Sequence, residues 1–341
     1  MDARDRLESL RYLVGNTPLL AIRLRFRGCE RTVYAKQESL NFTGSIKDRM
    51  ALHILEDAVL SGALQPGMEI TEATSGNTGI SFAALGRALG HDVRIYMPDW
   101  MSRERVLVIQ SLGATIVPVS QAEGGFKGSL EMAASYAASK AGVFQPLQFD
   151  NQANCSAHEK ATGPEIHEQL RLIGKRLTGF VAGVGTGGTV MGVGRYLKHR
   201  VGDVAVHPLE PANSPTLRAG SKVGKHRIQG ISDEFIPSIV DLGFLDPIVD
   251  AWDGDSILMA QKLARELGLA VGISSGANLL GAIQVADEQG ADAVVATVFA
   301  DSNKKYLSTD LCNVEQPQDH YLTQEVELIG FDVIPPRPMR A

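Results

Sequence analysis

Cysteine is scarce in this sequence, with 3 among 341 residues. Cys29, Cys155 and Cys312 lie far apart and form no CxxC pair, and no group of histidines with metal-ligand spacing accompanies them. This pattern argues against a disulfide framework and against a cysteine-based metal site. We therefore expect reduced thiols, no bound metal ion and a cytoplasmic location.

An excess of basic residues and long apolar runs are also missing. The chain has 33 Lys and Arg against 39 Asp and Glu, a net charge of −6, which argues against a nucleic-acid partner. No stretch approaches the roughly 18 apolar residues of a membrane helix. The N-terminal MDARDRLESLRYL is charged and lacks the apolar region of a signal peptide. At 44% hydrophobic and 21% charged residues, we expect a soluble globular protein without a membrane partner.

Apolar, β-rich runs alternate with amphipathic segments along the chain. This alternation is typical of βαβ units with buried parallel sheets, and the length favours about two domains. We therefore predict an α/β fold of two domains, each a mostly parallel sheet flanked by helices, with the site at the carboxyl ends of the strands. The predicted strands are 68–73, 92–98, 114–120, 179–185, 204–210 and 293–300, and the predicted helices include 80–89, 102–112 and 256–267.

Three polar, glycine-punctuated loops precede predicted helices. GVGTGGTVMGVGRYLK (183–198) follows a buried-type strand, so its backbone N–H groups and the helix dipole favour a phosphate. EATSGNTGIS (72–81) offers hydroxyl and amide donors that suit a carboxylate. VGISSGANLLGA (271–282) by itself is typical of a capped helix start.

The first of these loops also permits a dinucleotide-binding interpretation. Gly183, Gly185 and Gly188 match G-x-G-x-x-G, and Asp203 follows Gly183 by twenty residues. A nicotinamide-dependent oxidoreductase is therefore an alternative, although the pattern occurs in mid-chain after several strand–helix units. Glycines that only pack a helix on a strand are a second alternative.

Lys47 lies in ESLNFTGSIKDRMALHIL (38–55), between a turn-prone loop and the start of a helix. Most lysines in such a place are solvated charges. A reactive lysine, a phosphate loop and a carboxylate loop together indicate an amino-acid enzyme that uses pyridoxal 5'-phosphate, with the lysine holding the cofactor as a Schiff base.

Six segments resemble the cysteine synthase and cystathionine β-synthase family of fold-type II pyridoxal phosphate enzymes. They occur in the family's order and span roughly residues 8–312. The resemblance implies a cofactor in the cleft between a larger domain (1–47 plus 156–320) and a smaller, substrate-gripping domain (48–155), a C-terminal tail over 321–341, and a homodimer. The segments are VGNTPLL (14–20), GSIKDR (44–49), TSGNTG (74–79), HEKATGPEI (158–166), GTGGT (185–189) and GISSGA (272–277).

The resemblance also implies roles for single residues. Lys47 would be the Schiff-base lysine and proton carrier, Asn77 would bind the cofactor's 3-oxygen, and Ser274 would face the pyridine nitrogen. A serine at that nitrogen would leave it unprotonated and favour β-chemistry over transamination. The phosphate would be bound by Gly185, Thr186, Gly187, Gly188 and Thr189. The substrate carboxylate would be bound by Thr74, Ser75, Asn77, Thr78 and Gln148.

The family's common reaction is β-replacement, here L-cysteine from O-acetylserine or O-phosphoserine and sulfide through an α-aminoacrylate. One segment departs from cysteine synthases, because GISDEFIP (230–237) carries Ser232, Asp233 and Glu234 where small residues are usual. Both acids could point to solvent. Alternatively, Asp233 could act as a catalytic general base on water or a thiol. That role would suit cysteine conversion to serine and sulfide, or condensation of serine with homocysteine as in cystathionine β-synthases.

Overall fold

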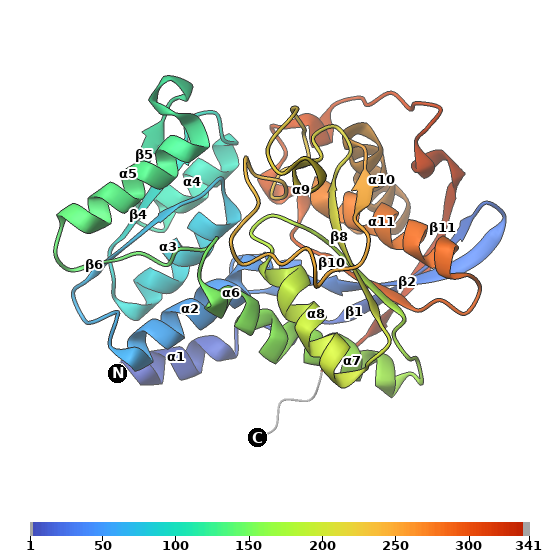
Figure 1. Ribbon diagram of the computed structural model, residues 1–341, viewed down its shortest axis with the longest axis horizontal. Coiled ribbons are helices and arrows are strands. Elements are labelled where there is room, and N and C mark those ends of the chain that lie inside the picture. Colours follow the sequence, from blue (N-terminus) through green and yellow to red (C-terminus); the bar gives the residue numbers. More distant parts are fainter. Residues whose placement is uncertain (1–2, 337–341) are drawn as a thin grey trace.

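The computed structural model describes residues 3–336 as two α/β lobes, each built on its own sheet (Figure 1). The seven-stranded sheet has the order β11-β1-β2-β10-β7-β8-β9, and the four-stranded sheet has the order β5-β4-β3-β6. All pairs of the smaller sheet are parallel, and in the larger sheet only β1 pairs antiparallel, with β2 and β11. The prediction of an α/β fold with two mostly parallel sheets is confirmed.

The larger sheet has helices on both faces. One core cluster packs α10 and α11 against the sheet, and another packs α7 and α8 against its other face. Its strands are β1 (Leu19–Phe26), β2 (Cys29–Gln37), β7 (Gly179–Gly183), β8 (Ala205–Pro211), β9 (Val249–Ala251), β10 (Val295–Phe299) and β11 (Val326–Ile334). Its helices are α7 (Gly163–Leu172), α8 (Gly188–Arg200), α9 (Thr216–Ala219), α10 (Asp253–Leu267) and α11 (Ile273–Gln289).

The smaller sheet lies between α5 on one face and α1 to α4 on the other, at the left of Figure 1. Its strands are β3 (Glu69–Ala73), β4 (Val93–Pro98), β5 (Thr115–Val119) and β6 (Val143–Phe144). The helices are α1 (Ala3–Arg11), α2 (Lys47–Ser61), α3 (Asn77–Leu89), α4 (Arg103–Ser111) and α5 (Gly125–Ser139). The chain returns to the larger lobe through α6 (Gln152–Ala157) and a π-helical turn, η3 (His158–Thr162).

All six predicted strands are present within two residues of their predicted ends. The smaller sheet lies inside 48–155 and every strand of the larger sheet lies outside it, although the division into domains at those positions stays a prediction. Among residues 3–336, no helix combines the length and apolar character needed to span a membrane.

The C-terminal tail is the expectation that the fold overturns. Residues 326–334 form β11, which pairs antiparallel with β1, so the last part of the chain (red) lies beside the first strand (blue) in Figure 1. The prolines that suggested a tail begin only after Ile334. VELIGFDVI has the mixed burial of an edge strand, which is a weaker sequence signal than the apolar runs of central strands. Residues 337–341 lie outside the described part of the chain.

Candidate active site

The candidate site is a pocket between the two lobes, at the carboxyl ends of the parallel strands. Loops after β3, β7 and β10 meet there with the first residue of α2 and the first turn of α11. The predicted residues that line it are Lys47, Thr74, Ser75, Asn77, Thr78, Gln148, Gly185, Thr186, Asp233 and Ser274. Gly187, Gly188 and Thr189 are not among the lining residues and lie where α8 begins.

Lys47 begins α2, as its sequence context predicted. Burial lowers the pKa of its amine, and the nearby carboxylates of Asp301 and Asp233 oppose this shift only in part. A lowered pKa increases the fraction of neutral amine, the form that can attack an aldehyde. The pocket therefore contains a buried lysine whose amine is more readily neutral than that of an exposed lysine.

Asp48, directly after Lys47, ties the start of α2 to the smaller lobe. Its buried carboxylate accepts hydrogen bonds from the Thr43 backbone N–H at 2.7 Å and hydroxyl at 2.5 Å, and from the Ser81 hydroxyl at 2.6 Å. Ser81 belongs to α3, so Asp48 joins the loop before Lys47 to that helix.

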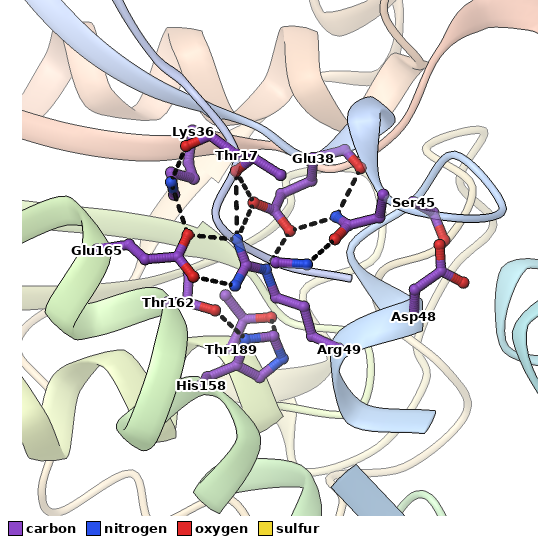
Figure 2. Close-up of polar contacts among 12 residues, drawn as sticks. Thr17, Lys36, Glu38, Ser45, Asp48, Arg49, His158, Thr162, Glu165 and Thr189 are labelled. Carbon is purple, nitrogen blue, oxygen red and sulfur yellow. Dashed lines mark hydrogen bonds and ion pairs between the residues drawn. The ribbon is translucent and has the colours of Figure 1, made fainter. Parts of the chain in front are cut away.

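Arg49 ties the same turn to the larger lobe through a buried ionic cluster, shown in Figure 2. Its guanidinium contacts Glu38 at 2.5 and 2.8 Å and Glu165 through two bonds of 2.8 Å. Lys36 adds an ion pair to Glu165 at 2.8 Å. Burial opposes ionisation of Glu165, but Arg49 outweighs it and holds the pKa of that carboxyl well below its usual range. The two residues that follow Lys47 are thus anchored, Asp48 to the smaller lobe and Arg49 to the larger one.

The GTGGT loop has glycines at positions where the structure leaves no room for a side chain. A Cβ on Gly185 would lie 2.5 Å from the Gly230 carbonyl oxygen, and one on Gly188 would lie 1.9 Å from Oδ1 of Asn154. Gly187 has φ +87°, and its added Cβ would lie 2.1 Å from Val240. Gly187 is also the N-cap of α8 and leaves the first turn of that helix without a side-chain cap. The backbone N–H groups of this uncapped turn are suited to an anion.

The second predicted loop, after β3, is held by its own side chains. The Thr78 hydroxyl donates to Gln148 at 2.7 Å, and Gln148 Nε2 donates to the Ala73 carbonyl at 2.7 Å. Asn77 is oriented by Asp301, which accepts from Nδ2 at 2.7 Å, and by Lys305, which donates to Oδ1 at 2.9 Å.

The third loop opens α11. Ser274 lines the pocket, whereas the Ser275 hydroxyl accepts from the Ala300 N–H at 3.0 Å and so supports the loop after β10. Of this serine pair, only Ser274 is placed to meet a ligand.

Asp233 is directed into the pocket by the unusual backbone of its neighbour. Ser232 has φ +55°, and this conformation is held by hydrogen bonds from its N–H to Val184 O (2.7 Å) and from its hydroxyl to Thr216 Oγ1 (3.0 Å). Burial raises the pKa of Asp233 to about 6, with Lys47 opposing the shift. Glu234 instead pairs with Lys222 at 3.1 Å. The two acids therefore differ in their surroundings: Asp233 lines the pocket with Lys47, and Glu234 forms an ion pair with Lys222.

Several pocket residues had no signal in the sequence analysis. They are Arg105, Phe126, Phe149, Gln229 and Tyr306, with Asp301 and Lys305 behind Asn77. Asp301, Lys305 and Tyr306 follow β10, so the rule that sites form at the carboxyl ends of strands could have found them. Arg105 is buried, its guanidinium carbon lies 4.8 Å from the Tyr306 ring centre, and no carboxylate within 3–336 forms a salt bridge with it.

The position of Asp203 contradicts the dinucleotide-binding interpretation. Asp203 precedes β8, so it lies at the amino end of that strand, opposite the edge where the pocket forms. An acidic residue at that end cannot reach a ribose bound at the carboxyl edge.

Comparisons with known proteins agree with the geometry. A family model described as "Pyridoxal-phosphate dependent enzyme" matches residues 10–301. A probable cysteine synthase of Bacillus subtilis (strain 168) is 42% identical over 299 residues, covering 88% of this chain and 96% of that protein. A hydrogen sulfide-producing enzyme from Fusobacterium nucleatum superposes with a TM-score of 0.95 at 50% identity, covering 97% of this chain and 99% of that one. An aspartate-to-asparagine variant of that enzyme, in complex with an α-aminoacrylate intermediate, gives 0.93 at 50% identity, covering 95% and 97%.

The residues present fit pyridoxal phosphate. Lys47 supplies an amine of lowered pKa, and the GTGGT loop, packed too closely for side chains at its glycines, ends in the N-terminus of α8, which has no side-chain cap. Ser274 supplies a neutral hydroxyl in the same pocket.

We predict that Glu165→Gln destabilises the protein by about 3–5 kcal/mol at pH 7, because it leaves the buried Arg49 short of one counter-charge. Urea unfolding measures this loss. Glu266→Gln is the matched control, because its exposed i,i+4 pair with Lys262 contributes only about 0.3–0.5 kcal/mol.

The stability due to Glu165 should also depend on pH. Its folded-state pKa is lowered, so the contribution is complete above about pH 4.3, the ordinary value of an unfolded glutamate, and is lost as the pH falls toward the folded-state pKa. The difference between wild type and Glu165→Gln should shrink in that acid range. A difference that grew on acidification would contradict an ionised Glu165.

Proposed function

Because the chain belongs to the pyridoxal-phosphate dependent enzyme family, we propose that it is a β-replacement enzyme that forms L-cysteine from O-acetylserine or O-phosphoserine and sulfide through an α-aminoacrylate. The observation that carries this proposal is the position of Lys47, whose amine lies in one pocket with both the GTGGT loop and the TSGNT loop. The bound cofactor would supply an electron sink for a negative charge at the substrate's Cα.

The chain's own residues have separate tasks in this proposal. The GTGGT loop binds the phosphate, and Thr74, Ser75, Thr78 and Gln148 bind the substrate's α-carboxylate. The neutral Lys47 amine removes the proton from Cα, which lets the group on Cβ leave. Asn77, held between Asp301 and Lys305, presents its amide to the cofactor's 3-oxygen, and Ser274 faces the ring nitrogen.

Asp233 supports a second candidate, the conversion of cysteine and water to serine and sulfide. In this reaction the Cβ–S bond breaks, a Cβ–O bond forms, and the Asp233 carboxylate accepts the proton of the attacking water. A carboxylate beside Cβ would also repel HS⁻. The Fusobacterium relative named for sulfide production is in accord with this candidate. Condensation of serine with homocysteine would use the same base on a thiol.

Product analysis distinguishes these candidates. The purified holoenzyme is supplied with O-acetylserine plus sulfide, with cysteine alone, or with serine plus homocysteine, and products are quantified by mass spectrometry. If cysteine forms in the first mixture faster than products form in the other two mixtures, the first candidate is supported. Serine and sulfide from cysteine, with ¹⁸O from labelled water in the serine, support the second. No β-replacement with any mixture would refute the proposed chemistry.

Lys47→Ala should abolish covalent cofactor attachment and turnover, because it removes the only amine that we assign to both tasks. After borohydride reduction, intact-protein mass spectrometry should show the cofactor adduct on wild type and on the surface control Lys262→Ala, but not on Lys47→Ala. An adduct of equal yield on Lys47→Ala would place the attachment elsewhere.

Asp233→Asn should lower serine formation from cysteine by about 100-fold or more, within the usual range for loss of a general base. In wild type this rate should fall as the pH drops through about 6, where Asp233 becomes protonated, and the variant should lack this limb. Glu234→Gln is the control and should keep it. Unchanged product ratios in Asp233→Asn would leave Asp233 without a catalytic role.

The homodimeric state and the cytoplasmic location remain predictions. Light scattering of the purified protein would measure the former.

A further inference from the structure

The segment formed by α6 and the π-helical turn η3 runs directly behind the GTGGT loop. A Cβ on Gly192 of α8 would lie 2.1 Å from the Cys155 carbonyl oxygen, and one on Gly188 would meet Asn154. These glycines let α8 approach the segment closely. π-Helical turns are rare and occur often at functional sites.

Asn154 contacts one threonine of the loop from this segment. Its side chain is 1% exposed, and Nδ2 donates to the Thr186 hydroxyl oxygen at 2.9 Å and to the Gln148 carbonyl at 2.9 Å. An amide N–H can only donate, so Thr186 accepts this bond and keeps its own proton for another acceptor.

His158 contacts the other threonine. It is 2% exposed, with Nδ1 at 2.9 Å from the Thr162 hydroxyl and Nε2 at 3.4 Å from the Thr189 hydroxyl (Figure 2). Burial, and then the charges of Arg49 and Lys47, lower the pKa of His158 well below its usual value. The ring is therefore neutral, with one nitrogen donating and the other accepting.

The phosphate site needs oriented hydroxyls because it has no positive side chain of its own. The run GVGTGGT contains no lysine or arginine, so backbone N–H groups and the two threonine hydroxyls are its donors. Each hydroxyl can rotate, and a hydroxyl helps an anion only when its proton points toward it.

We propose that Asn154 and His158, four residues apart, are positioning residues that hold the hydroxyls of Thr186 and Thr189 with their protons directed to the cofactor's phosphate. His158 donates from Nε2 to Thr189 and accepts at Nδ1 from Thr162. This inference rests on the proposed assignment of residues 185–189 as the phosphate loop.

The same segment connects the phosphate loop to the lysine. Thr162 ends η3, and Glu165, three residues later, binds Arg49 beside Lys47. Residues 154–165 thus contact both the phosphate loop and Arg49, two residues after Lys47.

The test compares pyridoxal phosphate with pyridoxal, which lacks the phosphate. Full-length protein freed of cofactor is titrated with each. His158→Leu and Asn154→Leu should each weaken pyridoxal phosphate binding about tenfold and leave pyridoxal binding unchanged. His158→Gln, whose Nε2–H can still donate, should bind pyridoxal phosphate nearly as wild type does. The ³¹P resonance of the bound cofactor should shift in both leucine variants and not in His158→Gln.

Thr189→Val provides a second measurement, a double-mutant cycle with His158→Leu. On this background, His158→Leu should cause little further loss, because the hydroxyl that it orients is gone. Equal losses for both ligands, or additive losses in the double variant, would overturn the inference. If Thr186→Val and Thr189→Val leave the preference for pyridoxal phosphate over pyridoxal unchanged, the phosphate-loop assignment itself is wrong.

Discussion

The buried ion pairs of Arg49 are the interaction on which the site's geometry depends most. They join η1 (Glu38–Leu40), which follows β2, to α7 through the first turn of α2, one residue beyond Asp48 and two beyond Lys47. Removing such charges from water is costly, and the cost is offset only when the partners match in geometry. The guanidinium meets two carboxylates with four short bonds, which restricts the orientation of this turn. The position of Lys47 is a consequence of that restriction.

The pKa values of Lys47 and Asp233 are shifted by burial, and each group limits the shift of the other. Burial lowers the pKa of Lys47 while Asp301 and Asp233 limit the change, and the same burial raises the pKa of Asp233. A lysine and an acid of shifted pKa, side by side, can divide two proton transfers between them. In cysteine synthesis sulfide adds to Cβ, whereas in serine formation sulfide leaves Cβ and water adds. Asp233 would assist the attack of water and repel HS⁻, so it is the residue that best distinguishes the two candidate reactions.

Much of the framework could be predicted from local pattern. Strands such as β7 and β10 are continuous apolar runs buried on both faces, and the loops after β3 and β7 carry glycines and hydroxyls at helix starts. Among the strands that were missed, β1, β2 and β11 include charged residues on partly exposed positions and form the antiparallel pairs of the larger sheet, whereas β6 and β9 are only two and three residues long. A search for continuous apolar runs, which are typical of buried parallel strands, does not detect them. Within the pocket, Arg105 and Phe126 come from helices without a motif of their own.

The sequence by itself determined the α/β class and indicated the candidate lysine and the loops that suit a phosphate and a carboxylate, because these depend on local residue order. Only the tertiary structure decided which groups face each other. It placed Asp233, not Glu234, beside Lys47, seated Asn77 between Asp301 and Lys305, and set Asn154 and His158 behind Thr186 and Thr189. Burial and long-range contacts establish these relations, and both arise only when segments distant in sequence pack together.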